Sequence, residues 1–124
     1  MKNFVFCVSA ALCLVAPAAA SATQWELVHN EGPNHSFYID PSRVKKVGNS
    51  MRVWELWANR VKGSFLMMLR EYDCRQERTR VLELTSHDNL TGQGNARERT
   101  NVEDPWIFVP PGAPIEKLMK RACR

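Results

Sequence analysis

The segment Phe65-Leu-Met-Met-Leu-Arg-Glu-Tyr-Asp-Cys74 decides how this chain folds. If the segment is extended, its side chains alternate between two faces. One of the two sets ends in the thiol and consists of Leu66, Met68, Arg70, Tyr72 and Cys74. We therefore predict a strand that ends in a cysteine, a charged turn over residues 75–79 and a returning strand over residues 80–85. The face with Leu66, Met68 and Tyr72 is where we expect the C-terminal segment to dock.

Residues 1–22 have the pattern of a secretory signal peptide. A lysine near the start is followed by an apolar run over residues 4–15 and by small residues that end in Ala20-Ser-Ala22. The apolar run is shorter than the roughly 20 residues that a membrane-spanning helix needs. Neither Cys7 nor Cys13 follows a small residue, so we expect no acyl anchor. The sequence predicts an exported domain over residues 23–124, without a membrane span.

The composition of the exported part narrows the class of protein. Its length suits one domain with a modest core. The formal net charge of +4, one unit of which belongs to Lys2 in the leader, is mild and does not indicate nucleic-acid binding. Cys74 and Cys123 are the cysteines left in an oxidising compartment, where a structural disulfide is favoured over a metal or redox site. A bond between them would close a long loop and stabilise the fold by roughly 4 kcal/mol.

Further extended segments are bounded by turn residues. We predict strands over residues 25–29, 36–40 and 51–58 and an apolar strand or docking segment over residues 105–109. Between them we expect a short helical turn over residues 41–48, an irregular loop over residues 87–94 and an exposed extension over residues 95–104 with at most a short edge strand.

The C-terminal segment has the pattern of a short amphipathic helix. Ile115, Leu118, Met119 and Ala122 recur at helical spacing, and Cys123 lies beside this apolar stripe. About six strands followed by one helix indicate an α+β fold. We therefore predict an antiparallel sheet of about six strands, with the C-terminal helix tethered to one face by a Cys74–Cys123 disulfide.

Several short motifs occur in order along the exported chain. They are Trp25, Tyr38-Ile-Asp40, Met51-Arg-Val-Trp54, Tyr72-Asp-Cys74, Arg80-Val-Leu82, and Trp106 ahead of Pro110-Pro111. In this combination the chain resembles the bacterial surface-adhesin protein E family over residues 24–123. The resemblance implies an antiparallel sheet with a disulfide-tethered helix, and binding to host extracellular-matrix or serum proteins. Family members with that role are lipid-anchored, so the missing acyl anchor favours a periplasmic or released protein.

Two groups of residues are candidates for a binding surface. Trp54 and Trp57 lie on opposite faces of one predicted strand, so one of them would be exposed and form a patch for a partner or for a homodimer. The alternative is that both belong to the core. Arg75, Arg78 and Arg80 form a basic cluster that suits an acidic partner, although a solvated strand end is its more ordinary explanation.

Candidates for catalysis and metal binding are weak. His29 and His35 flank a predicted hairpin turn, but two histidines without a third ligand are poor evidence for a metal site. Residues 86–88, Ser-His-Asp, have the side chains of a hydrolase triad in the wrong geometry, because triad members are not adjacent in sequence. Glu71 and Asp73 are explained by cross-strand pairing with the nearby arginines. We therefore expect no catalytic site, no metal and no cofactor.

The sequence accordingly predicts a non-enzymatic exported binding protein. It would present a sheet face or the region of residues 87–104 to a host matrix or serum protein. The alternative is a periplasmic protein that binds a small ligand between helix and sheet or that maintains the envelope. The periplasm, the cell surface and the medium are all compatible with an exported protein.

Overall fold

The computed structural model describes the backbone of residues 24–87, 96–101 and 104–124 and the side chains of residues 24–86 and 104–124. The predicted signal peptide and most of the predicted loop over residues 87–94 lie outside these ranges. The elements, in chain order, are β1 (Glu26–Glu31), β2 (His35–Ile39), the 3-10 helix η1 (Pro41–Arg43), β3 (Lys45–Val47), β4 (Ser50–Asn59), β5 (Ser64–Asp73), β6 (Arg78–His87), β7 (Ala96–Asn101), β8 (Ile107–Phe108) and α1 (Pro114–Ala122).

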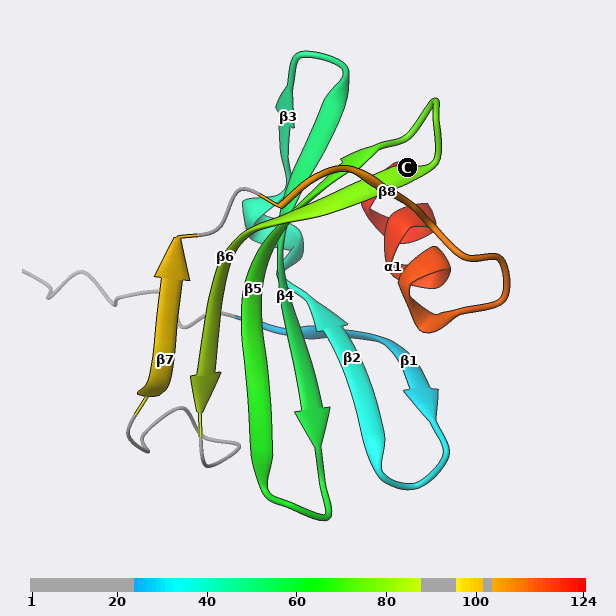
Figure 1. Ribbon diagram of the computed structural model, residues 1–124. Coiled ribbons are helices and arrows are strands. Elements are labelled where there is room, and N and C mark those ends of the chain that lie inside the picture. The colour runs from blue at the N-terminus through cyan, green and yellow to red at the C-terminus, as the bar shows by residue number, and fades with distance from the viewer. Residues whose placement is uncertain (1–23, 88–95, 102–103) are drawn as a thin grey trace, which may run out of the picture.

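The strands of the described part form one antiparallel sheet. Its main path has the order β1-β2-β4-β5-β6-β7, while β3 pairs with β4 and β8 pairs with β6 (Figure 1). Six strands on the main path and a single C-terminal helix confirm the predicted α+β fold. The two strands off this path are short, with three and two residues, which is why their sequences carry little alternation.

The β4–β5 hairpin sets the register at the centre of the sheet. Its strands pair along their whole length, from Ser50 with Asp73 to Asn59 with Ser64. The turn is held by the Asn59 side-chain oxygen, which accepts hydrogen bonds of 3.1 Å from two backbone N–H groups of the turn. Gly63 adopts a φ of 63°, a conformation that glycine reaches without strain. This register places Arg70 and Tyr72 on the same face as Glu55.

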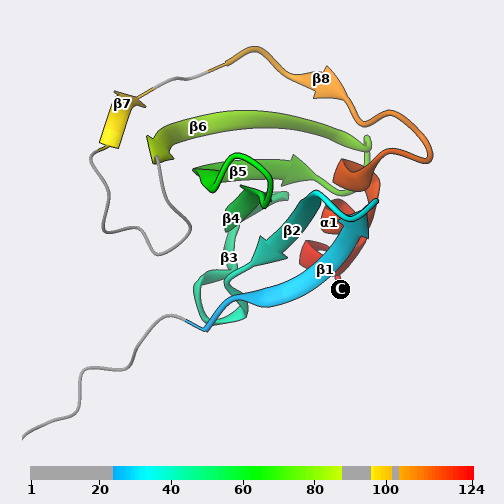
Figure 2. The ribbon, with the colours of Figure 1, turned by 90° about the horizontal axis from the view of Figure 1, so that it is seen from below.

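The sheet curves around α1, so that one face is concave and covered by the helix (Figure 2). Residues from β2, β4, β5, α1 and the segment that precedes α1 form the core: Phe37, Ile39, Val53, Tyr72, Val109, Leu118, Met119 and Ala122. The apolar stripe of α1 therefore packs on the sheet as predicted. It covers the face that was predicted from the position of the Cys74 thiol. Arg121 adds a bidentate contact to Glu26 of β1, with N–O distances of 2.7 and 2.9 Å.

The disulfide between Cys74 and Cys123 is present, with a Cα–Cα distance of 5.9 Å. It joins the end of β5 to the residue that follows α1, where the Cys123 backbone N–H donates to the Met119 carbonyl at 2.8 Å. The predicted tether of the helix to one face of the sheet is thus confirmed.

The segment after β2 differs from the prediction. The expected helical turn over residues 41–48 is limited to η1, and Lys45–Val47 is a strand paired with the start of β4. Asp40 caps η1, because its carboxylate accepts hydrogen bonds from the backbone N–H of Ser42 at 3.0 Å and from the Ser42 hydroxyl at 2.6 Å. Past this turn the chain returns along β4, and the ladder hydrogen bonds of the sheet replace those of a helix.

Candidate functional site

The predicted binding residues fall into two separate places in the structure. Trp54 and Trp57 lie on opposite faces of β4, as predicted, and both are half-buried. Trp54 lies under the guanidinium of Arg43, at 5.6 Å from Cζ to the ring centroid. Trp57 lies on the concave face against Phe37 and Arg70. Both rings are half-buried, which fits neither a fully exposed anchor nor a purely core residue, so an exposed tryptophan anchor stays a prediction.

Arg78 and Arg80 converge on a different tryptophan. Their guanidinium carbons lie 4.8 and 4.5 Å from the ring centroid of Trp106, within the range of cation–π contacts. Arg78 also donates to Asp73 at 3.0 Å, and Arg80 donates to Glu71 at 3.4 Å. The carboxylates of β5 therefore pair with the arginines of β6, as the sequence predicts. Arg75, the third predicted arginine, is exposed in the β5–β6 turn, and the structure places Arg78 and Arg80 but not Arg75 against Trp106.

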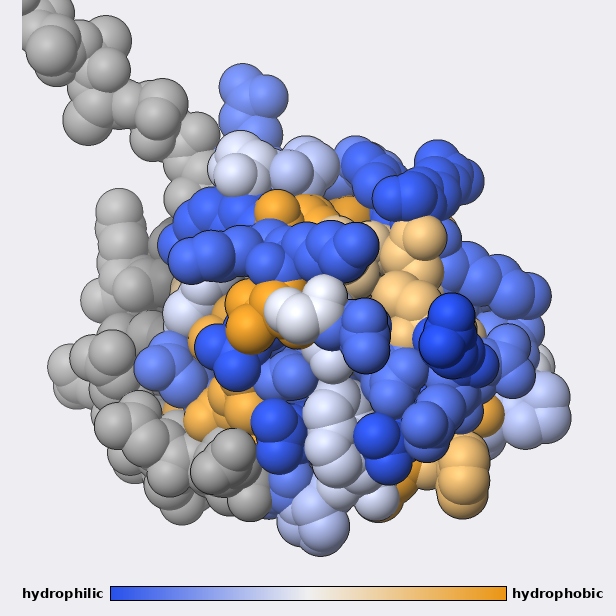
Figure 3. Space-filling model, turned by 90° about the horizontal axis from the view of Figure 1, so that it is seen from above, coloured by the Kyte–Doolittle hydropathy of each residue, from blue (hydrophilic) through white to orange (hydrophobic). Residues whose placement is uncertain are grey.

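β8 adds one exposed aromatic side chain, Phe108, to the same area. Arg78 pairs with Phe108 across β6 and β8, which places these two side chains on one face of the sheet. Phe108 is 79% exposed on this face, whereas its neighbour Ile107, 55% exposed, lies on the opposite face. We call the set of Arg78, Arg80, Trp106 and Phe108 the β6–β8 surface. Figure 3 shows this end of the molecule, where hydrophobic areas lie between hydrophilic side chains.

A charged network lies on the concave face, beneath α1 and β8. Glu55 is fully buried, and its carboxylate accepts hydrogen bonds from Arg70 Nε at 3.1 Å, Trp57 Nε1 at 3.0 Å and the Tyr72 hydroxyl. Arg70 reaches on to the hydroxyl of Thr79 at 3.4 Å. We call Glu55, Arg70 and Tyr72 the buried charge network.

Burial is the largest influence on the pKa values of Glu55 and Tyr72. It raises the pKa of the Glu55 carboxyl, and the charge of Arg70 and the hydrogen bonds from Tyr72 and Trp57 offset only part of that rise. Burial, followed by the charge of Glu55, also raises the pKa of Tyr72 well above its usual value. The phenol therefore stays neutral and donates a hydrogen bond to the Glu55 carboxylate. This arrangement fixes Trp57 in place and leaves no described member of the network open to solvent.

His29 and His35 do not converge with other metal ligands among the described side chains. His29 stacks on Phe37 and lies 3.2 Å from Lys117 Nζ, whereas His35 lies 3.5 Å from the Asn59 amide nitrogen. Among the side chains that the structure describes, no three His, Cys, Asp or Glu residues are placed to hold a metal ion. The serine–histidine–aspartate motif at residues 86–88 lies partly outside the described residues. No helix in the described ranges is long and apolar enough to cross a membrane.

Comparison with known protein families identifies the family of this chain. A family model described as surface-adhesin protein E matches residues 25–124. The chain belongs to the surface-adhesin protein E family. No curated protein and no solved structure matches it significantly. Membership supports a binding role of the surface-adhesin type and a surface or secreted location.

Two parts of the site were not among the predicted residues. Trp106 and Phe108 were expected only as part of an apolar strand or docking segment, because the sequence does not say which strand β8 joins. Glu55 and Arg70 carried a readable signal. Each is a charged residue within a set of alternating apolar side chains, and two opposite charges at such positions indicate a buried pair.

Proposed function

We propose that this protein is an exported, non-enzymatic binding module that attaches to a host extracellular-matrix or serum protein through the β6–β8 surface. The observation that carries the proposal is the exposure of Phe108 beside two arginines that are already stacked on Trp106. Aromatic residues and arginine are the types enriched at the centres of protein interfaces, where a few of them supply most of the binding free energy.

The surroundings of Phe108 suit a partner with an apolar pocket and an acidic rim. Arg75 is exposed at the edge, and Arg78 is about a third exposed, so both add positive charge around the aromatic side chain. Rim charges of this kind accelerate association and give it salt dependence more than they raise affinity. The absence of enzymatic activity is supported by the carboxylates Glu55, Glu71 and Asp73, each of which is held by an arginine.

The test is direct binding to a panel of purified matrix and serum proteins, measured by surface plasmon resonance. For a partner that binds saturably, Phe108→Ser is expected to weaken binding by about tenfold or more, the effect of losing an interface hot spot. Val61→Ser is the matched control, because Val61 is 73% exposed in the β4–β5 turn, at the opposite end of the sheet (Figure 1). Equal effects of the two substitutions, or none from Phe108→Ser, would contradict the proposal.

Location and self-association provide two further checks. Cell fractionation with surface protease treatment should find the protein at the surface or in the medium, and a purely periplasmic protein would rule out direct adhesion. Sedimentation of the wild-type protein and of Phe108→Ser tests whether a second copy of the chain uses the same surface. A dimer that the substitution dissociates would assign the β6–β8 surface to homodimerisation and not to a host protein.

A further inference from the structure

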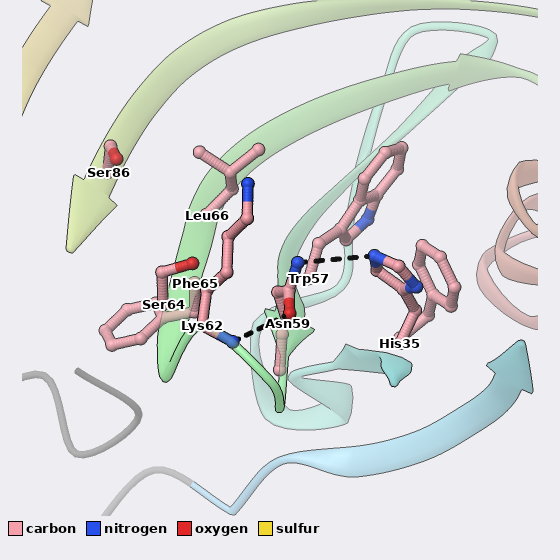
Figure 4. A pocket seen from close by; sticks show the side chains of 10 residues that line it. His35, Trp57, Asn59, Lys62, Ser64, Phe65, Leu66 and Ser86 are labelled. Carbon is pink, nitrogen blue, oxygen red and sulfur yellow. Dashed lines mark hydrogen bonds between the residues drawn. The ribbon is translucent and has the colours of Figure 1, made fainter. Parts of the chain in front are cut away.

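The concave face of the sheet contains a hollow that is separate from the β6–β8 surface. It has a volume of about 400 Å³, which is within the range of pockets that bind small molecules. Phe37, Trp57 and Leu66 provide its apolar wall, and Asn59 and Lys62 of the β4–β5 turn lie at its rim (Figure 4). No residue of the β6–β8 surface lines it.

The aromatic part of the wall is fixed before any ligand arrives. The rings of Phe37 and Trp57 pack edge to face, with centroids 5.2 Å apart. The indole N–H of Trp57 donates to Glu55 at 3.0 Å, and the guanidinium of Arg70 lies 5.3 Å from the indole ring centroid. The buried charge network therefore holds the wall in one conformation, which reduces the entropy that a ligand would lose on binding.

A second hollow makes the site elongated. It has a volume of about 320 Å³ and shares Phe37 and Trp57 with the first as lining. Its other walls are Ile107 and the Pro110–Ile115 segment that leads into α1, and Glu31 lies at its edge. Because both hollows are lined by Phe37 and Trp57, they adjoin at this aromatic pair, and together they suit a flexible chain better than a compact molecule. We call the two hollows the trough.

The charges differ between the two hollows. Among the described residues that line the first hollow, Lys62 is the lysine and there is no carboxylate. The Asn59 oxygen already accepts from two backbone N–H groups, and its amide nitrogen lies 3.5 Å from His35, so one of the two N–H groups of this nitrogen is left for a ligand (Figure 4). Glu31 would repel an anion at the edge of the second hollow. An anionic head group therefore fits at the Lys62 end, with its apolar chain directed toward the Pro110–Ile115 segment.

We infer that this trough binds a single-chain amphiphile with an anionic head group. The alkyl chain lies against Leu66, Trp57 and Phe37, and the head group accepts hydrogen bonds from Lys62 and Asn59. A free fatty acid and a lysophospholipid share this chemistry. The site is independent of the proposed adhesion surface, so that loss of one function leaves the other intact.

The first experiment is isothermal titration calorimetry of the purified protein with dodecanoate, below the concentration at which it aggregates. We expect saturable binding of one molecule, together with a change in tryptophan fluorescence. Dodecyltrimethylammonium has the same alkyl chain and a cationic head group, and it should bind much more weakly. Equal binding of the two probes, or no saturable binding of dodecanoate, would overturn the inference.

Substitution at the rim tests where the head group lies. Lys62→Gln should weaken dodecanoate binding by about tenfold, the effect of one charge-assisted hydrogen bond, and it leaves an exposed side chain of similar length. Lys45→Gln is the matched control, because Lys45 is an exposed lysine on β3 at the other end of the sheet (Figure 1). Equal losses for the two variants would overturn the placement of the site.

Chain length and head group test the rest of the trough. Affinity should rise by about fourfold for each methylene added to a saturated fatty acid, until the chain fills both hollows. An affinity that does not depend on chain length would overturn the inference. Lysophosphatidylglycerol with the same chain identifies the source: tighter binding than dodecanoate indicates a lipid ligand, and weaker binding indicates a free fatty acid.

Discussion

Replacing Arg70 with methionine is expected to destabilise the protein strongly at neutral pH. The side chains of Arg70 and Glu55 are 6% and 0% exposed, and their ion pair has an N–O distance of 3.1 Å. Arg70→Met would leave the Glu55 carboxylate buried without a cation. Removing one partner of a buried pair costs about 3–5 kcal/mol, which is a large share of the roughly 5–15 kcal/mol by which a domain is stable.

The loss should depend on pH in a definite direction. Burial already raises the pKa of Glu55 while Arg70 lowers it, so the pKa rises further in Arg70→Met. A carboxyl whose pKa is higher in the folded state than in the unfolded state contributes stability that is fully present below the unfolded pKa. That contribution is lost as the pH rises through the folded pKa. The difference between Arg70→Met and the wild-type protein should therefore shrink as the pH falls toward about 4.3, the value for an unfolded glutamate.

Urea unfolding followed by tryptophan fluorescence, at neutral pH and near pH 4, measures both effects. Arg52→Met is the matched control, because Arg52 is 38% exposed and Glu71 keeps its contact with Arg80 when Arg52 is removed. That variant should lose less than about 1 kcal/mol. The double variant Glu55→Gln/Arg70→Met should recover much of the stability at neutral pH. A loss in Arg70→Met that is the same at both pH values, or a double variant no more stable than Arg70→Met, would refute the reasoning.

Two further predictions concern the tether and the turn after β2. Cys74→Ser should expose a free Cys123 thiol and cost about 4 kcal/mol, because the bond closes a loop with a sequence separation of 49 residues. Calorimetry should show a melting temperature lower by about 15–30 °C, and a shift of only a few degrees would mean that packing alone holds α1. Burial raises the pKa of Asp40, but hydrogen bonds from Ser42 and Arg43 outweigh it, so the pKa lies below its usual value. Asp40→Ala should cost about 1–2 kcal/mol at neutral pH. A lowered pKa contributes stability that is lost as the pH falls through the folded pKa, so urea unfolding should show a smaller difference in stability between Asp40→Ala and the wild-type protein in strong acid. A difference in stability that does not change with pH would contradict the role of the Asp40 charge.

The elements that the sequence predicts best are those whose pattern is local and repeated. β5 is a ten-residue strand whose core face is marked by the thiol of Cys74 directly after it, and α1 carries an apolar stripe over two turns, so the core-facing side of each can be read from local spacing. The pairing of Cys74 with Cys123 followed from the number of cysteines left after the leader. The same patterns did not give β3, and they gave β8 only as an apolar strand or docking segment over residues 105–109 without its partner strand, because two or three residues are too few to alternate.

The candidate site was predicted in part. The basic cluster of β6 was named from the sequence, but its tryptophan was not, because Trp106 reaches Arg78 and Arg80 only through the pairing of β8 with β6. The contact between Glu55 and Arg70 could have been derived. The short turn between β4 and β5 pairs Asn59 with Ser64, and counting back along the hairpin pairs Glu55 with Met68, two residues from Arg70 on the same face.

The backbone around β8 explains why an exposed aromatic residue there suits binding. Asp104 N–H donates to the Val81 carbonyl at 3.2 Å, and Val109 N–H donates to the Glu77 carbonyl at 2.8 Å, so β8 is anchored to β6 at both ends. Phe108 between these anchors is therefore held outward by its strand position and not by a loose chain. A side chain that is exposed on an ordered backbone loses little conformational entropy when a partner covers it, so more of its burial free energy goes into affinity. The same anchoring places Ile107 on the opposite face as a wall of the trough, so one short strand supplies a side chain to each of the two proposed sites.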